Sequence, residues 1–206
     1  MESTPRPSRV ANAIVIAAST GGPQALHAVC AGLPRYVSAT PVFIVLHMPE
    51  GFADIVASQL ERVTGIPASA TRADEIARPG HFYVAASGAH LKLERIGSLV
   101  RLKHQDSEPV NYCKPSADIL FKSAAEVYGP GTIGVVLSGM GTDGLEGCRA
   151  IVSAGGRVLV QDEASSAVWG MPGAVVRNNI ASRVLPPDRI AQYLQMRLGR
   201  QDLSVA

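Results

Sequence analysis

Short apolar runs alternate along the chain with segments whose apolar residues recur at helical spacing. The strongest apolar runs are AIVIAA at 13–18, TPVFIVLH at 40–47 and TIGVVLSG at 132–139. Segments of helical periodicity follow or precede them, at 22–33, 51–65, 116–129, 145–156 and 186–200. This alternation predicts parallel strands joined by crossover helices rather than a sandwich or a bundle. We therefore predict an α/β fold, doubly wound, with a mainly parallel sheet and helices on both faces.

Two central stretches depart from that alternation. The segment HLKLERIGSLVRLKH at 90–104 alternates apolar and polar residues around Ile-Gly-Ser, which predicts an antiparallel hairpin. The polar segment QDSEPVNYCKP at 105–115 has no periodicity, so we predict an exposed loop of the kind that often carries recognition. A chain of 206 residues suits one domain. We place that domain at 11–200, with tails or linker remnants at 1–10 and 201–206.

Charge and composition argue against several kinds of partner. The net charge is +2 and the charged residues are scattered singly, so there is no basic stripe that would bind nucleic acid. No apolar run approaches the roughly 20 residues of a membrane-spanning helix, and the polar N-terminus lacks the apolar region of a secretory signal. We expect a soluble, cytoplasmic protein that is not inserted in a membrane. We also expect a monomer, because no apolar face is left over once helices cover the sheet.

Cysteines and histidines are spaced too widely to predict a metal site. Cys30, Cys113 and Cys148 lie far apart without a C-x-x-C motif, which fits neither a disulfide framework nor a zinc knuckle. The sequence also has no H-x-x-x-H or Cys-His cluster. We expect the cysteines to fill core or surface positions in a reducing compartment, and we expect no metal and no cofactor.

Candidate catalytic side chains stand at the ends of three predicted strands. Ser19 follows the first apolar run, His47 ends the second, and Asp143 lies shortly after the third. In open parallel sheets, ligands bind beyond the carboxyl ends of the strands, so these side chains share one edge. A serine, a histidine and an aspartate supply a nucleophile, a general base and an orienting carboxylate, whatever their order in the chain. The sequence therefore predicts a Ser-His-Asp triad.

The turn that carries Ser19 is suited to stabilise negative charge. The backbone N–H groups of Thr20, Gly21 and Gly22 are expected to point outward at a helix N-terminus, where an oxyanion is favoured. The turn matches the nucleophile elbow G-x-S-x-G only in part, because Ala17 occupies the first glycine position. We expect it to be less strained than that elbow.

Structural alternatives exist for each of these motifs. Ser-Thr-Gly-Gly before a helix is common as an N-cap, and the same turn could cradle a phosphate. His47 at a strand end could be a satisfied structural histidine. The segment GMGTDG could be a phosphate loop, although it lacks the lysine of a P-loop. Each motif taken alone therefore leaves its role open.

Five motifs together resemble a known family. ASTGG, HMPEGF, LSGMGTDG, QDEAS and WGMP occur in the order and at about the spacing of the catalytic domain of the chemotaxis protein-glutamate methylesterases, the CheB family, over residues 13–194. The resemblance implies a cytoplasmic hydrolase that removes methyl groups from glutamyl methyl esters on the helical cytoplasmic domains of chemoreceptors. It implies that many members also deamidate receptor glutamines.

The resemblance also implies roles for single residues. The triad of the family corresponds to Ser19, His47 and Asp143. Thr20 and Met140 should line the pocket, with the Met140 backbone N–H as a candidate oxyanion donor. QDEAS and WGMP, at 161–165 and 169–172, should form loops that frame the site.

The sequence departs from the family pattern at two places. Full-length members resemble a response regulator with an N-terminal receiver domain, whereas about ten residues precede the first predicted strand here, so we expect no receiver within this chain. The segment VNYCKPS stands where many relatives carry a more basic run ending in Arg-Pro-Ser. Two alternatives therefore stay open: a stand-alone esterase acting on another substrate, and a binding module without turnover.

Overall fold

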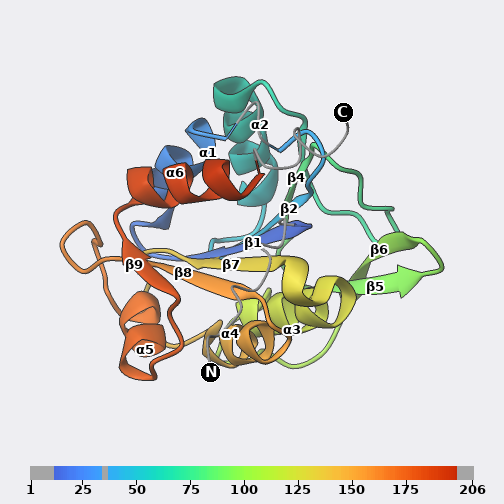
Figure 1. Ribbon diagram of the computed structural model, residues 1–206. Coiled ribbons are helices and arrows are strands. Elements are labelled where there is room, and N and C mark those ends of the chain that lie inside the picture. Colours follow the sequence, from blue (N-terminus) through green and yellow to red (C-terminus); the bar gives the residue numbers. More distant parts are fainter. Residues whose placement is uncertain (1–11, 34–36, 199–206) are drawn as a thin grey trace, which may run out of the picture.

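A parallel sheet lies at the centre of the computed structural model, which describes residues 12–33 and 37–198 (Figure 1). Its seven strands follow the order β3-β4-β2-β1-β7-β8-β9, and all neighbouring pairs are parallel. The strands are β1 (Ala13–Ala18), β2 (Val42–Leu46), β3 (Ala68–Ala70), β4 (Phe82–Val84), β7 (Thr132–Val136), β8 (Arg157–Gln161) and β9 (Arg183–Leu185).

Helices cover both faces of this sheet (Figure 1). On one face lie α1 (Gly22–Ala31), α2 (Phe52–Thr64) and α6 (Pro187–Leu198). On the other face lie α3 (Ala117–Tyr128), α4 (Leu145–Ser153) and α5 (Met171–Arg177). The predicted doubly wound α/β fold is confirmed.

The central strands are apolar at every position because both of their faces are buried. In β1, Ile14 and Ile16 belong to the core beneath α1, α2 and α6, whereas Val15 and Ala17 belong to the core beneath α3, α4 and α5. Successive side chains of a strand point to opposite faces, so a strand covered on both sides reads as a continuous apolar run. This is why the sequence predicted these strands so clearly.

The predicted hairpin is a separate two-stranded antiparallel sheet, formed by β5 (His90–Ile96) and β6 (Leu99–Gln105). It is attached to α3 through Ser123, whose hydroxyl oxygen accepts a hydrogen bond from the Leu93 N–H at 3.0 Å. A short 3-10 helix, η1 (Gly129–Gly131), leads from α3 into β7. The segment after β6 has no helix or strand until α3 begins, as predicted.

Besides η1, two elements were not predicted. Strand β9 is only three residues long, too short for a periodic signal. Helix α5 begins at Met171 and includes Pro172 in its first turn, so the prediction of a loop through 169–172 is wrong for these two residues. The loop predicted at 161–165 is likewise wrong for Gln161, which is the last residue of β8. Proline is favoured at the start of a helix because its missing N–H would be unpaired there in any case.

The ends of the chain remain predictions. The expected tails at 1–10 and 201–206 lie outside the described residues. The last predicted helix, 186–200, extends to Leu198 within the described part. None of the helices described has both the length and the apolar character needed to cross a bilayer.

Candidate active site

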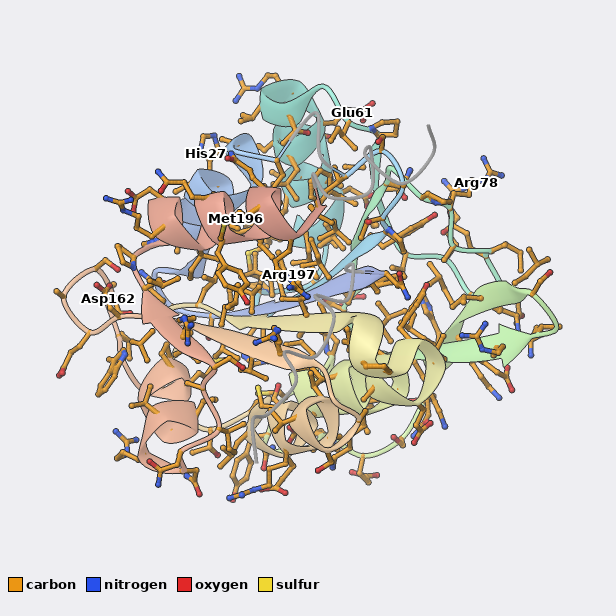
Figure 2. The ribbon with its side chains drawn as sticks, in the orientation of Figure 1. His27, Glu61, Arg78, Asp162, Met196 and Arg197 are labelled. Atoms are coloured by element: carbon orange, nitrogen blue, oxygen red, sulfur yellow. The ribbon has the colours of Figure 1, made fainter. Side chains whose placement is uncertain are left out.

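The ends of β1 and β2 place Ser19 and His47 side by side. Ala18 and Leu46 are paired in the ladder of these strands, and the His47 N–H donates to the Ala18 carbonyl at 3.0 Å. The Ser19 N–H in turn donates to the Ser138 carbonyl, at 3.0 Å, just beyond β7. The carboxyl edge of the sheet therefore fixes the backbone of both residues. Figure 2 labels Asp162, the residue after β8, which marks this same edge.

His47 and Asp143 are joined directly. The distance from His47 Nε2 to Asp143 Oδ2 is 2.8 Å, and the side chains are 15% and 2% exposed. A buried carboxylate beside one ring nitrogen holds the proton on that nitrogen, so that the other, Nδ1, is an acceptor. The expected contact between His47 and Asp143 is present, although these residues are 96 positions apart.

Asp143 is held by the N-terminus of α3. Its Oδ1 accepts a hydrogen bond from Ser116 Oγ at 2.6 Å, and its Oδ2 accepts one from the Ala117 N–H at 2.7 Å. Burial by itself would raise the pKa of Asp143, but the hydrogen bonds from His47, Ser116 and Ala117 outweigh it, and the pKa lies below its ordinary value. Asp143 is therefore an ionised carboxylate beside the imidazole.

The turn after β1 carries Ser19 without using it as a helix cap. The N-cap of α1 is Gly21, with φ of 75°, and no side chain caps the helix. The Gly22 N–H donates to the Ser19 carbonyl at 2.7 Å, which closes the turn. The Ser19 hydroxyl forms no hydrogen bond with His47 in the described part of the chain. The N-cap alternative is therefore wrong for Ser19, and its half-buried side chain lies at the sheet edge next to His47.

The other predicted pocket residues lie around Ser19. Thr20 is exposed, Gly21 is half-buried, and the Met140 side chain is 74% exposed. Among the described residues, the backbone N–H groups of Thr20 and Met140 donate to no other protein group. Gly139 lies so close to Ser19 that a Cβ on Gly139 would be 2.8 Å from Ser19 Cβ. Ser19 and the Met140 segment are thus in direct contact.

Two further segments hold the turn in place. Ser138 Oγ donates to the Thr20 carbonyl at 2.7 Å and accepts from the Val168 N–H at 3.0 Å. Gln161 Oε1 accepts from the Ser138 N–H at 2.8 Å, and Trp169 Nε1 donates to the Gln161 carbonyl at 3.0 Å. The QDEAS and WGMP segments therefore support the backbone around Ser19.

Sequence reasoning missed two neighbours of His47 and Asp143. It assigned Ser116 only to the start of a helix, whereas its hydroxyl also bonds Asp143. It expected Cys113 only to fill a core or surface position, whereas its Sγ lies 3.8 Å from His47 Nδ1. Burial, followed by the charges of Asp143 and Asp118, raises the pKa of Cys113 to about 11, so this thiol is protonated at neutral pH. It is therefore a weak competitor as a nucleophile.

Comparison with known proteins identifies the family of this chain. The family model described as CheB methylesterase matches residues 14–194. The chain belongs to the CheB methylesterase family. Its fold is similar to the crystal structure of the Thermotoga maritima CheB methylesterase catalytic domain, with a TM-score of 0.87 and 32% sequence identity. That match covers 91% of this chain and 99% of the other.

Longer relatives in the CheB family match the chain over part of their length. A protein named protein-glutamate methylesterase/protein-glutamine glutaminase from Nitrobacter hamburgensis is 47% identical over 182 residues, which cover 88% of this chain and 48% of that protein. A protein named protein-glutamate methylesterase/protein-glutamine glutaminase 2, from Caulobacter vibrioides, is 42% identical over 192 residues. These cover 93% of this chain and 55% of that protein. The chain thus spans about half the length of the curated relatives it matches.

Proposed function

We propose that this chain is a serine hydrolase that demethylates glutamyl methyl esters, with Ser19 as nucleophile, His47 as general base and Asp143 as orienting carboxylate. The observation that carries the proposal is the 2.8 Å contact between His47 Nε2 and the buried Asp143 carboxylate, at the strand end adjoining Ser19. A serine is a poor nucleophile unless a base removes its proton, and a histidine held by a carboxylate is such a base.

The geometry suggests which ring nitrogen acts as the base. Because Nε2 is bonded to Asp143, Nδ1 is the nitrogen that takes the Ser19 proton as the hydroxyl oxygen attacks the ester carbonyl. The imidazolium then gives that proton to the leaving methoxide, methanol departs, and an acyl-enzyme remains. Water repeats these steps to release the glutamate carboxylate and restore Ser19. A hydrogen bond between nucleophile and base often forms only when substrate is bound, so its absence here is compatible with this sequence of steps.

Backbone donors are available for the oxyanion of the tetrahedral intermediate. We assign this role to the N–H groups of Thr20 and Met140, supported by the absence of another partner for either among the described residues. Gly21 is the N-cap of α1, so the positive end of this helix lies at the turn and favours developing negative charge.

The substrate class follows from the names of the relatives. They are named for two reactions, ester hydrolysis at glutamate and amide hydrolysis at glutamine. Both are acyl transfers to water that differ only in the leaving group, so one Ser-His-Asp site suffices for both. We propose methylated chemoreceptor helices as the protein substrate, and the cytoplasm as the place of action. A pocket that includes Gly21 but none of the three triad residues is proposed to receive part of such a helix. It is lined by Gly21, Gln24, Ala25, Ala28, Gln161, Ser165, Ala167 and Pro187.

The proposal is tested with Ser19→Ala and a matched serine control, Ser58→Ala, on the exposed side of α2. Methanol release from a methylated receptor should fall by about 10⁴-fold in Ser19→Ala, because the nucleophile is lost, and should be unchanged in Ser58→Ala. A fluorophosphonate should label the unsubstituted chain and Ser58→Ala but not Ser19→Ala.

Other results would favour the alternatives. Labelling of Ser19 without methanol release from receptor would point to an esterase with another substrate. No labelling of any variant would point to a binding module. Full methanol release by Ser19→Ala would refute the assignment of the nucleophile.

A further inference from the structure

The Cys113 thiol is held in a defined position beside His47. Val110 and Cys113 exchange backbone hydrogen bonds of 3.1 and 2.9 Å, which close a tight turn. Within that turn, Asn111 Nδ2 donates to Asp118 Oδ2 at 2.9 Å, and Asp118 is only 2% exposed. The turn is therefore anchored to a buried carboxylate of α3.

The distance between Cys113 and His47 suits two ligands of one metal ion. Sγ and Nδ1 are 3.8 Å apart. At Zn–S and Zn–N distances of about 2.3 and 2.0–2.1 Å, two ligands of a tetrahedral zinc ion are about 3.6 Å apart. Ligand atoms of His47, Cys113 and Asp143 all lie within 4.8 Å of one another. A shift of a few tenths of an ångström would bring sulfur and nitrogen to the coordination distance.

Asp143 is placed to orient the histidine rather than to bind the ion. Both of its oxygens already accept hydrogen bonds, from His47 and Ala117 on one and from Ser116 on the other. A histidine that binds zinc commonly donates its second ring N–H to a carboxylate, which directs the free nitrogen at the metal. The same contact with Asp143 that suits His47 to act as a base therefore also suits it to bind a metal ion.

We propose that His47 Nδ1 and Cys113 Sγ bind Zn²⁺ reversibly, and that the bound ion blocks the proposed hydrolase by occupying the nitrogen that must accept the Ser19 proton. The blocking role depends on the proposed function, whereas binding does not. Zn²⁺ replaces the thiol proton, which passes to the buffer, so one Zn–S bond forms, one S–H bond breaks and nothing is oxidised. A sulfur and an imidazole select a soft ion over Mg²⁺ or Ca²⁺. Water fills the remaining positions, so the ion is exchangeable.

Binding is tested with Co²⁺ and Zn²⁺ alone, in buffer without chelator. The unsubstituted chain should bind one Co²⁺ with the near-ultraviolet charge-transfer absorption of a cobalt–thiolate bond, and Zn²⁺ should displace it. Cys113→Ser should lose this absorption and bind Zn²⁺ at least about 10-fold more weakly. Loss of a residue that only hydrogen-bonds a metal ligand already lowers metal affinity by about that factor. His27→Gln, which removes an exposed histidine of α1 (Figure 2), should match the unsubstituted chain. Equal urea midpoints for the variants would show that each is folded.

Fluorophosphonate labelling of Ser19 measures whether bound Zn²⁺ blocks the proposed hydrolase. Zn²⁺ should slow labelling of the unsubstituted chain at least about 10-fold, EDTA should restore it, and Cys113→Ser should resist Zn²⁺ relative to its own metal-free rate. Absence of the cobalt–thiolate absorption, or equal Zn²⁺ affinity in Cys113→Ser, would overturn the site. Metal binding with unchanged labelling would overturn the blocking role. If the cobalt absorption is present but no variant is labelled without metal, the metal site is supported and the proposed hydrolase fails instead.

Discussion

Substitution of Gly21 by alanine tests how closely the Ser19 turn is packed. Gly21 has φ of 75°, where an L side chain costs about 1–2 kcal/mol. A Cβ there would lie 2.5 Å from Ala167 Cβ and 2.8 Å from Ser138 Oγ, so neighbouring groups must move. Overpacking of this kind costs about 1–3 kcal/mol. We therefore expect Gly21→Ala to lower the free energy of unfolding by about 2–5 kcal/mol.

Gly51 offers a matched control at the start of another helix. It is the N-cap of α2, with φ of 84°, and no heavy atom lies within 4 Å of the position of its Cβ. Gly51→Ala should therefore lower the free energy of unfolding only by the cost of the left-handed backbone, about 1–2 kcal/mol. The pair separates the cost of a left-handed backbone from the cost of crowding.

Urea unfolding at neutral pH measures both variants, with the slope against urea checked for equality. Gly21→Ala should be the less stable variant, and its fluorophosphonate labelling should fall because displacement of Ala167 and Ser138 disturbs the turn that holds Ser19. Gly51→Ala should label at the normal rate. Equal losses of stability in the two variants would show that the turn has room for a methyl group, and the account of its packing would be wrong.

Two predictions concern Asp143 and its surroundings. Because the pKa of Asp143 is lowered in the folded state, its charge stabilises the fold above its unfolded pKa of about 3.9, and this contribution is lost as pH falls through the folded value. The difference in unfolding free energy between the unsubstituted chain and Asp143→Asn should therefore shrink below about pH 4; a difference independent of pH in urea titrations would contradict this. Ser116→Ala removes both the hydrogen bond to Asp143 and the side-chain cap of α3, and should cost about 2–4 kcal/mol in the same assay. A loss below about 0.5 kcal/mol would mean that other donors replace the hydroxyl, since exposed substitutions commonly fall in that range.

The site combines rigid and exposed parts in a way that suits a large substrate. Asp143 is buried under the start of α3, and His47 is almost buried beside it. Thr20 and Met140, by contrast, are exposed at the rim. The buried contact between Asp143 and His47 thus lies beneath an exposed rim. This arrangement is compatible with the proposed receptor substrate.

The sequence by itself determined the fold class and the residues at the sheet edge. Continuous apolar runs such as 13–18 arise because both faces of a central strand are buried, and this information is local to each run. Parallel strands then place Ser19 and His47 at the same edge of the sheet, whereas the structure shows that their strands are neighbours. The short strand β9 and the helix α5 escaped prediction because neither has enough residues for a periodic signal.

Only the tertiary structure decided how the side chains at that edge meet. The ring nitrogen of His47 that faces Asp143, the second role of Ser116, and the approach of Cys113 to His47 across 66 positions depend on the paths of loops that carry no periodicity. Hydrophobic burial determines which face of an element points inward, and so it is visible in the sequence. Contacts between loops depend on turns, hydrogen bonds and the helix ends to which they are anchored, and these are settled only when the whole chain is folded.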